Sequence, residues 1–226
     1  MRTLVTVVCG TLLMPALTVQ GAPASSRQPR VLFFGDSLVQ GTGTLPRRPL
    51  LVDRACTLLH WTSVIDGHGG TGYTTGGRHG RSYTYRLRHE RTLRSPYDVV
   101  VLEGGTNDAR YGALPHLERD ALAVVERVHR AEPGARLVLL GVWAPPQVDQ
   151  TRYREADELL RLVAGRTGLT YVSQLGWSGD RLLSADGYHP SAAGYIGLGQ
   201  ALAHAVDPRL PAPVGAEGIE PPTTRL

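Results

Sequence analysis

This chain of 226 residues has 24 basic residues, all of them arginine, and 20 acidic residues, which give a formal net charge of +4. The modest charge balance and the absence of a nucleic-acid-binding motif argue against a nucleic acid partner. Because the sequence contains no lysine, a Walker-type phosphate loop is also excluded.

The first 24 residues, 1–24, predict a secretory signal peptide. Arg2 is followed by an apolar stretch at 4–19 and then by Ala-Pro-Ala at 22–24, a pattern suited to signal peptidase. A membrane anchor would need about 20 mainly apolar residues, and this stretch is shorter and interrupted. We therefore expect a secreted, extracellular protein without a stable membrane anchor. Removal of the leader leaves Cys56 as the single cysteine, so the mature chain cannot form an internal disulfide.

Residues 28–207 predict one α/β domain, and the Pro/Gly-rich segment 208–226 predicts a tail that carries no chemistry. Strands are expected at 30–34, 62–66, 98–102, 136–142 and 169–172. Helices are expected at 50–60, within 82–93, and at 114–131, 151–167 and 191–205. The third and fourth strands are almost continuously apolar, which indicates a parallel sheet covered by helices on both faces. In such sheets ligands bind outside the carboxyl ends of the strands.

Polar motifs follow the predicted strands where such a ligand would bind. Ser37 comes directly after the first strand in the sequence Gly-Asp-Ser, and a glycine-rich segment at 67–72 follows the second strand. Asn107 follows the third strand within Gly-Gly-Thr-Asn-Asp. Asp186 and His189 are three residues apart near the far end of the chain.

These residue types together predict a serine hydrolase. A serine hydroxyl is a poor nucleophile at neutral pH and needs a neutral imidazole to take its proton during attack on an acyl carbon. His189 can act as this general base and then protonate the leaving alcohol, while Asp186 orients the ring and stabilises its charge. The Asn107 side-chain amide is a candidate donor to the oxyanion that develops during the attack.

The four segments, in this order, resemble the sequence blocks of the GDSL or SGNH hydrolase family over roughly residues 30–206. The resemblance implies the SGNH hydrolase fold, a flavodoxin-like three-layer α/β/α sandwich with a mainly parallel five-stranded sheet. It also implies a catalytic triad and an oxyanion hole. The triad residues are Ser37, Asp186 and His189, and the oxyanion donors are the backbone N–H groups of Ser37 and Gly70 and the side-chain amide of Asn107.

The second block matches the family less closely than the others. The family often has an asparagine earlier in this block, where this chain has Ile65 or Asp66. Gly69 therefore remains an alternative to Gly70 as the oxyanion donor.

Simpler interpretations of the same residues stay open. Asp36 and Ser37 could cap the following helix, and Asn107 could be only a turn residue. Asp180 is a second acid close to Asp186. For Asp108 we expect a role in ordering its loop rather than in catalysis.

The arginines between 78 and 94 predict a solvated helix face, and contact with an anionic envelope polymer stays open as the alternative. No metal or cofactor is expected, because His89 and Glu90 lack the second histidine of a zinc motif and the mature chain has one cysteine. Candidate pocket residues are Leu38, 73–77, Arg110, Tyr111, 143–146 and Tyr188.

The sequence thus predicts a secreted, monomeric serine esterase that hydrolyses carboxylic ester bonds through an acyl-serine intermediate. Its partner would be a small-molecule, polysaccharide or lipid acyl ester. An acyltransferase that uses the same residues is one alternative, and a carbohydrate-binding module on a non-catalytic scaffold of this fold is another.

Overall fold

The computed structural model describes residues 27–90, 92–93, 96–177 and 182–210. The predicted signal peptide and most of the predicted tail lie outside these residues, and so does Asp180. The boundaries of the predicted leader and tail therefore stay predictions.

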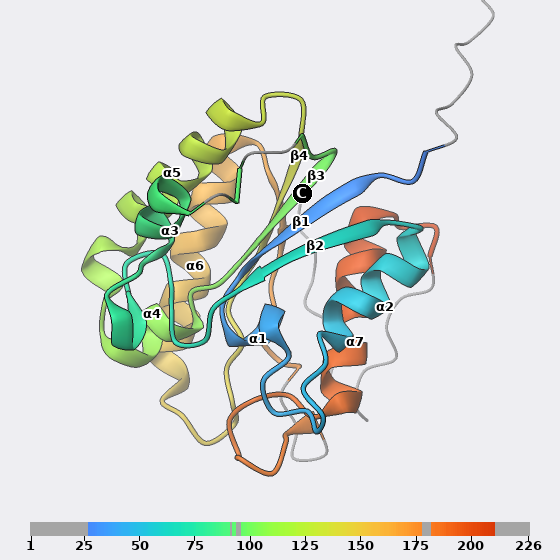
Figure 1. Cartoon of the computed structure of the whole chain (residues 1–226). Coiled ribbons are helices and arrows are strands. Elements are labelled where there is room, and N and C mark those ends of the chain that lie inside the picture. Colours follow the sequence, from blue (N-terminus) through green and yellow to red (C-terminus); the bar gives the residue numbers. More distant parts are fainter. Residues whose placement is uncertain (1–26, 91, 94–95, 178–181, 211–226) are drawn as a thin grey trace, which may run out of the picture.

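An entirely parallel sheet of five strands forms the centre of the domain, in the order β2-β1-β3-β4-β5 (Figure 1). The strands are β1 (Arg30–Gly35), β2 (Thr62–Gly67), β3 (Val99–Glu103), β4 (Arg136–Leu140) and β5 (Thr170–Val172). All five strands that the sequence predicts are present. The chain passes from β1 to β2 on one side and then crosses back to β3 on the other side of β1, and ligands bind at such switch points of open parallel sheets.

Helices cover both faces of the sheet, which confirms the expected three-layer α/β/α fold (Figure 1). On one face α2 (Leu50–Leu59) packs against α7 (Ala192–Val206). On the other face lie α3 (Tyr83–His89), α5 (Leu114–Ala131) and α6 (Gln150–Thr167). Two short helices that the sequence analysis does not predict, α1 (Ser37–Gln40) and α4 (Thr106–Tyr111), directly follow β1 and β3.

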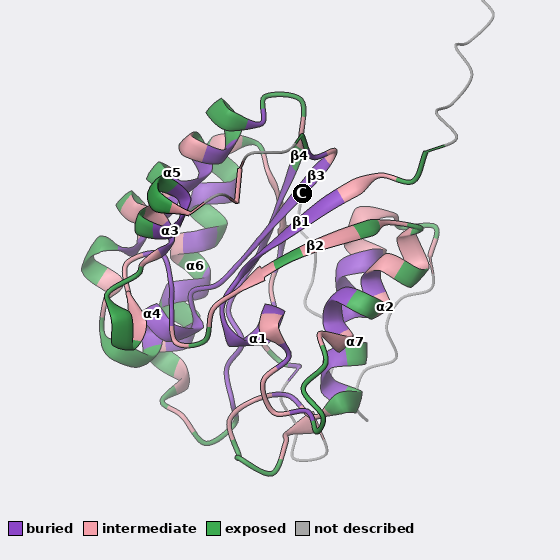
Figure 2. Ribbon diagram, viewed as in Figure 1, coloured by how far each residue is buried: buried purple, intermediate pink, exposed green. Residues whose placement is uncertain are grey.

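Alternate strand residues supply two hydrophobic cores, one on each face of the sheet. Leu32 and Phe34 of β1 belong to the core beneath α3, α5 and α6, whereas Val31 and Phe33 belong to the core beneath α2 and α7. The central strands are buried on both faces, as their apolar runs predict, and the edge strand β2 is half-exposed (Figure 2).

The long helices follow ordinary sequence signals. Buried residues of α5 recur at Leu117, Ala121, Val124 and Val128, the spacing of one helix face. Gly168, with φ of 68°, caps the end of α6 in the left-handed region. Within the described residues, no helix is both long enough and apolar enough to cross a membrane.

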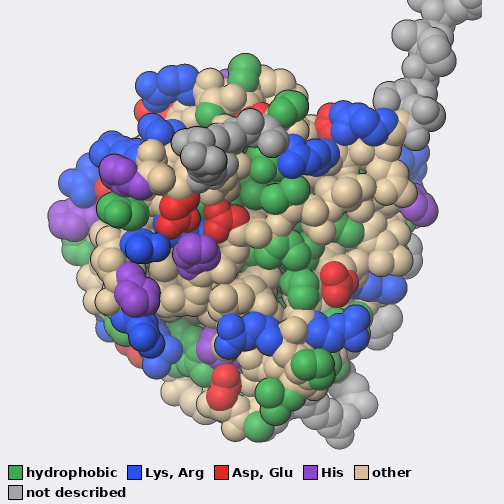
Figure 3. All heavy atoms as spheres, viewed as in Figure 1, with side chains coloured by type: hydrophobic (Ala, Val, Ile, Leu, Met, Phe, Trp, Pro, Cys, Tyr) green, Lys and Arg blue, Asp and Glu red, His purple; other side chains and the backbone are tan. Residues whose placement is uncertain are grey.

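The prediction of a solvated arginine face is wrong for Arg86, whose side chain is completely buried. Buried residues of α3 are Tyr83, Arg86 and Leu87, so the arginine lies on the inner face of the helix. The guanidinium lies 4.1 Å from the ring centroid of Phe34. On the molecular surface of Figure 3, basic, acidic and histidine side chains are interspersed rather than gathered into one positive patch.

Candidate active site

The proposed nucleophile lies at the sharp connection between β1 and α1. β1 ends at Gly35, Asp36 is the N-cap residue, and Ser37 is the first residue of α1. The Asp36 carboxylate accepts a hydrogen bond from the backbone N–H of Leu38 at 2.8 Å. The capping interpretation is therefore correct for Asp36. The Ser37 hydroxyl makes only a long contact of 3.5 Å with Asp36 Oδ1 and also faces a second group.

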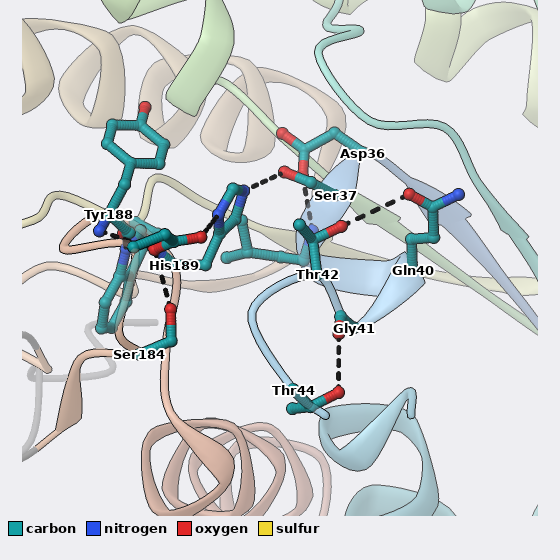
Figure 4. A network of polar contacts seen from close by, with 12 residues as sticks. Asp36, Ser37, Gln40, Gly41, Thr42, Thr44, Ser184, Tyr188 and His189 are labelled. Atoms are coloured by element: carbon teal, nitrogen blue, oxygen red, sulfur yellow. Dashed lines mark hydrogen bonds and ion pairs between the residues drawn. The ribbon is translucent and has the colours of Figure 1, made fainter. Parts of the chain in front are cut away.

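That group is His189, which comes from the loop before α7. The His189 ring points at the Ser37 hydroxyl (Figure 4), with 3.0 Å between His189 Nε2 and Ser37 Oγ. The distance from His189 Nδ1 to Asp186 Oδ2 is 2.7 Å. The three side chains thus form a continuous hydrogen-bonded line of nucleophile, imidazole and acid.

Asp186 is held in place by its own loop. Its Oδ1 accepts hydrogen bonds from the backbone N–H groups of Tyr188 and His189, both at 2.9 Å, and from the Ser184 hydroxyl at 2.7 Å. Partial burial alone would raise the pKa of Asp186, but hydrogen bonds from the His189 backbone and ring and from Ser184 hold that pKa well below its ordinary value. The carboxylate therefore stays ionised at neutral pH, as a partner of an imidazolium must.

Contacts with two distant segments of the chain fix the position of the His189 loop. The backbone O of Tyr188 accepts a hydrogen bond from the indole N–H of Trp143 at 2.9 Å. Gly43, after α1, has φ of 99°, and a Cβ atom there would lie 2.8 Å from His189 Cβ and 2.8 Å from Ser184 Oγ. Only glycine fits this conformation and this close approach.

The glycine-rich segment forms a tight turn beside the proposed nucleophile. The backbone N–H of Thr71 donates to the carbonyl of His68 at 3.3 Å, and Gly70 has φ of 78° at the third position of this turn. A Cβ atom at Gly69 would lie 3.7 Å from Ser37 Cβ. Within the described part of the chain, the backbone N–H of Gly70 has no hydrogen-bond acceptor, so it is free to donate to a ligand.

Asn107 links this turn to the nucleophile segment. Its side-chain Nδ2 donates to Asp36 Oδ2 at 2.7 Å and to the carbonyl of Thr71 at 2.9 Å. The structure thus brings Asn107 to the same edge of the sheet as Ser37. Both amide hydrogens have protein acceptors here, so donation to an oxyanion requires one of these bonds to be shared or released.

Asp108 orders the loop after the glycine turn, as expected. Its carboxylate accepts hydrogen bonds from three consecutive backbone N–H groups, those of Tyr73, Thr74 and Thr75, at 3.0, 3.0 and 2.8 Å. This loop forms one wall of an open pocket beside Gly70.

The pocket has a volume of about 450 Å³, and four of its seven lining residues are glycine. Its lining residues are Gly69, Gly70, Thr75, Gly76, Gly77, Arg78 and Tyr111. The prediction that Leu38 and Trp143 line a pocket is wrong, because both side chains are completely buried in the core.

A second cluster could in principle hold a metal ion. Asp66, His68 and Glu90 have ligand atoms within 4.8 Å of one another. The Arg86 guanidinium already donates to Asp66 and lies 3.6 Å from Glu90 Oε2. The acids of this cluster are therefore paired with a protein cation, which opposes the binding of a metal ion.

The sequence analysis missed two buried charged residues beside the site. Arg86 donates to the carbonyl of Gly35 at 2.8 Å and to the Thr71 hydroxyl at 3.1 Å, so it connects the serine and glycine segments. The helical spacing of 83, 86 and 87 was the available signal. Glu103 ends β3 and is completely buried, and it immediately follows the apolar run of that strand.

Comparison with known proteins agrees with this arrangement. Residues 33–195 match the model of the GDSL-like lipase/acylhydrolase family. Similar solved structures include the lipase/acylhydrolase from Enterococcus faecalis, with a TM-score of 0.64 and 22% identity over 84% of this chain and 100% of that chain. Another is the family two carbohydrate esterase from Clostridium thermocellum in complex with cellohexaose, with a TM-score of 0.64 and 19% identity over 83% of this chain and 66% of that chain. No curated protein sequence matches the chain.

Proposed function

Because the chain belongs to the GDSL-like lipase/acylhydrolase family, and so is a hydrolase acting on ester bonds, we propose that it cleaves carboxylic esters through an acyl intermediate on Ser37. The observation that carries this proposal is the continuous hydrogen-bonded line from Ser37 Oγ through the His189 ring to Asp186. A neutral imidazole in this position can accept the serine proton, and an ionised acid on its far side stabilises the charge that results.

The reaction proceeds in two halves. In the first, Ser37 Oγ attacks the acyl carbon while His189 Nε2 takes the hydroxyl proton, and the same proton then passes to the leaving alcohol. In the second, His189 removes a proton from the water that attacks the acyl-serine, and then returns this proton to Ser37 Oγ as the bond to the acyl carbon breaks and the carboxylic acid leaves. Asp186 keeps the ring oriented throughout.

The oxyanion of each tetrahedral intermediate would receive hydrogen bonds from the backbone N–H groups of Ser37 and Gly70 and from the Asn107 amide. Support for this assignment comes from the free N–H of Gly70 and from the place of Asn107 between Asp36 and Thr71. Such donors stabilise the transition state because they are already oriented before the charge develops.

We propose that the substrate carries a short acyl group. The pocket beside Gly70 is open, has a volume of about 450 Å³ and combines backbone amides with the exposed ring of Tyr111 and the charge of Arg78. A long alkyl chain would find little apolar surface there. We also propose export after cleavage behind residue 24, which N-terminal sequencing of protein from the culture medium would test by finding Ser25 first.

The test is hydrolysis of p-nitrophenyl acetate, butyrate and octanoate by the chain from residue 25 and by its Ser37→Ala variant. We expect the substitution to lower kcat by at least about 10⁴-fold, because it removes the only atom that can carry the acyl group. The matched control is Ser82→Ala, since the Ser82 side chain makes no capping hydrogen bond at the start of α3. Undiminished hydrolysis by Ser37→Ala would refute the mechanism.

A further inference from the structure

Glu103, the last residue of β3, is completely buried beside the end of β1. Its Oε2 accepts a hydrogen bond from the backbone N–H of Asp36 at 3.2 Å. A Cβ atom at Gly35 would lie 2.6 Å from the same oxygen, so the carboxyl packs directly on β1. Its other oxygen, Oε1, accepts no hydrogen bond of ordinary geometry within the described residues, although the Gln174 side chain is close enough to lower the pKa of the carboxyl. A buried ionised carboxylate with an unsatisfied oxygen is very unfavourable, whereas a protonated carboxyl is not.

The two neighbouring carboxyls, Glu103 and Asp36, respond differently to burial. Burial raises the pKa of Glu103 well above its ordinary value, and the charge of Asp36 raises it further. Burial also raises the pKa of Asp36, but only to about 6, because hydrogen bonds from the Leu38 backbone and from the Glu103 carboxyl oppose it. Two buried carboxyls in contact hold one proton between them. The pKa of Glu103 is raised further than that of Asp36, so at neutral pH the proton belongs to Glu103, and the side-chain hydrogen bond that shifts both pKa values then runs from Glu103 to Asp36.

Other titratable or charged groups face the pair from each surrounding element. They are Tyr73 from the glycine-rich loop, Tyr83 and Arg86 from α3, Asp108 from α4, His189 from its loop and Tyr195 from α7. Burial raises the pKa of each of the three tyrosines, so they stay neutral at pH 7.

The position of the Asp36 carboxylate matters because each of its oxygens supports part of the proposed oxyanion hole. Oδ2 accepts from the Asn107 amide, and Oδ1 accepts from the backbone N–H of Leu38 in the helix that begins with Ser37. A shift of Asp36 would therefore move an oxyanion donor and the start of the nucleophile helix together.

We propose that Glu103 is a positioning residue for the oxyanion hole, where it acts as a neutral carboxylic acid that holds the Asp36 carboxylate against the Asn107 amide. This inference rests on the proposed function, in which Asn107 is an oxyanion donor. Glu103 itself touches no reacting atom.

The first test compares Glu103→Gln with Glu103→Met in the hydrolysis of p-nitrophenyl acetate, at a temperature where circular dichroism shows both variants folded. Glutamine keeps a donor and an acceptor at this place, so we expect kcat within about threefold of the wild type. Methionine keeps the length but removes both hydrogen-bonding atoms. We expect it to lower kcat by about 10- to 100-fold with little change in KM, a smaller loss than removal of an oxyanion donor itself. Equal kcat values for the two variants would overturn the proposal.

The second test needs no turnover and so remains decisive if Glu103→Met does not fold or if Ser37 proves not to be the nucleophile. Asn107 is the only asparagine of the sequence, so labelling with ¹⁵N-asparagine gives a single pair of side-chain amide signals. We expect this pair to keep its wild-type shifts in Glu103→Gln and to move in Glu103→Met. We also expect the wild type at pH 7 to show an infrared carbonyl band of a buried carboxylic acid that is lost in Glu103→Gln. Absence of that band, or a displaced Asn107 signal in Glu103→Gln, would refute the assignment.

Discussion

At the scale of single residues, Ser37 lies between two carboxylates whose environments shift their pKa values in opposite directions. Hydrogen bonds keep the pKa of Asp186 low, although its partial burial acts against this, whereas burial raises that of Asp36 to about 6. Both groups are mainly ionised at pH 7, but they serve different purposes. Asp186 supports the imidazole, and Asp36 orients the Asn107 amide.

The Asn107→Ala substitution removes one proposed oxyanion donor. We expect kcat to fall by about 10² to 10³-fold, which corresponds to about 3–4 kcal/mol of transition-state stabilisation, with little change in KM. Steady-state kinetics on p-nitrophenyl acetate measures both constants. The control is Gln150→Ala, whose amide donates to the carbonyl of Pro145 away from the triad, and this variant should keep the wild-type rate. If Asn107→Ala also kept it, the amide would have no role in the oxyanion hole.

The raised pKa of Asp36 predicts how the free energy of unfolding depends on pH. Its pKa rises from 3.8 to about 6 on folding, so the folded state binds the proton more tightly than the unfolded state. Its contribution to stability is therefore fully present below about pH 4 and is lost as the pH rises through 6. The loss is at most about 3 kcal/mol. Urea unfolding between pH 4 and 7 should show Asp36→Asn gaining stability relative to the wild type as the pH rises. If the difference in unfolding free energy between Asp36→Asn and the wild type stayed constant from pH 4 to 7, burial would not raise the pKa of Asp36.

At the scale of secondary-structure elements, the site depends on two very short connections. One residue separates β1 from α1, and two residues separate β3 from α4. The first turns of these two helices therefore carry Ser37 and Asn107. Parallel pairing of β1 with β3 then places Ser37 and Asn107 at the same edge. The loop that carries His189 reaches this edge by packing against Gly43.

Arg86 in α3 joins these elements through buried hydrogen bonds to Gly35, Asp66 and Thr71. We expect Arg86→Met to lower the free energy of unfolding by about 3–5 kcal/mol, because it leaves a half-buried Asp66 without its cation. The matched control is Arg88→Met on the exposed side of the same helix. This substitution should change the free energy of unfolding by less than about 0.5 kcal/mol. Denaturant titration compares the two. Similar small losses for both variants would show that the buried arginine does not hold the segments together.

Gly43→Ala tests the contact between the two ends of the site. The new methyl group would meet His189 and Ser184 at 2.8 Å, and it would also be strained at φ of 99°. Gly168→Ala has a comparable strain, with φ of 68°, but no atom within 4 Å of the added carbon. We expect both variants to lose about 1 kcal/mol of stability or more, and only Gly43→Ala to lose most of its esterase activity. Equal activity of the two would show that the His189 loop tolerates displacement.

At the scale of the whole molecule, patterns within one segment predicted most of the fold. Apolar runs located all five strands, and helical periodicity located the long helices. The four motifs predicted which side chains meet, because parallel strands bring their carboxyl ends to one edge.

The features that the sequence analysis missed or predicted wrongly depend on contacts between distant segments or on segments too short for a pattern. Arg86 and Glu103 have ionisable side chains of types that ordinarily lie in solvent, and their burial depends on partners from other elements, namely Gly35, Asp66, Thr71 and Asp36. Leu38 follows the serine motif and Trp143 follows β4, but both side chains turn into the core. Short helices such as α1 have too few residues for a periodic pattern.

The separation of Ser37 from His189 by 152 residues has a consequence for how the protein is made. The serine segment leaves the ribosome early, whereas the histidine loop comes late, directly before α7, the last helix of the described residues, which packs on α2. In the proposed mechanism, a nascent or shortened chain that lacks residue 189 holds the Ser37 hydroxyl without a base to activate it. We therefore expect such a chain to have no esterase activity.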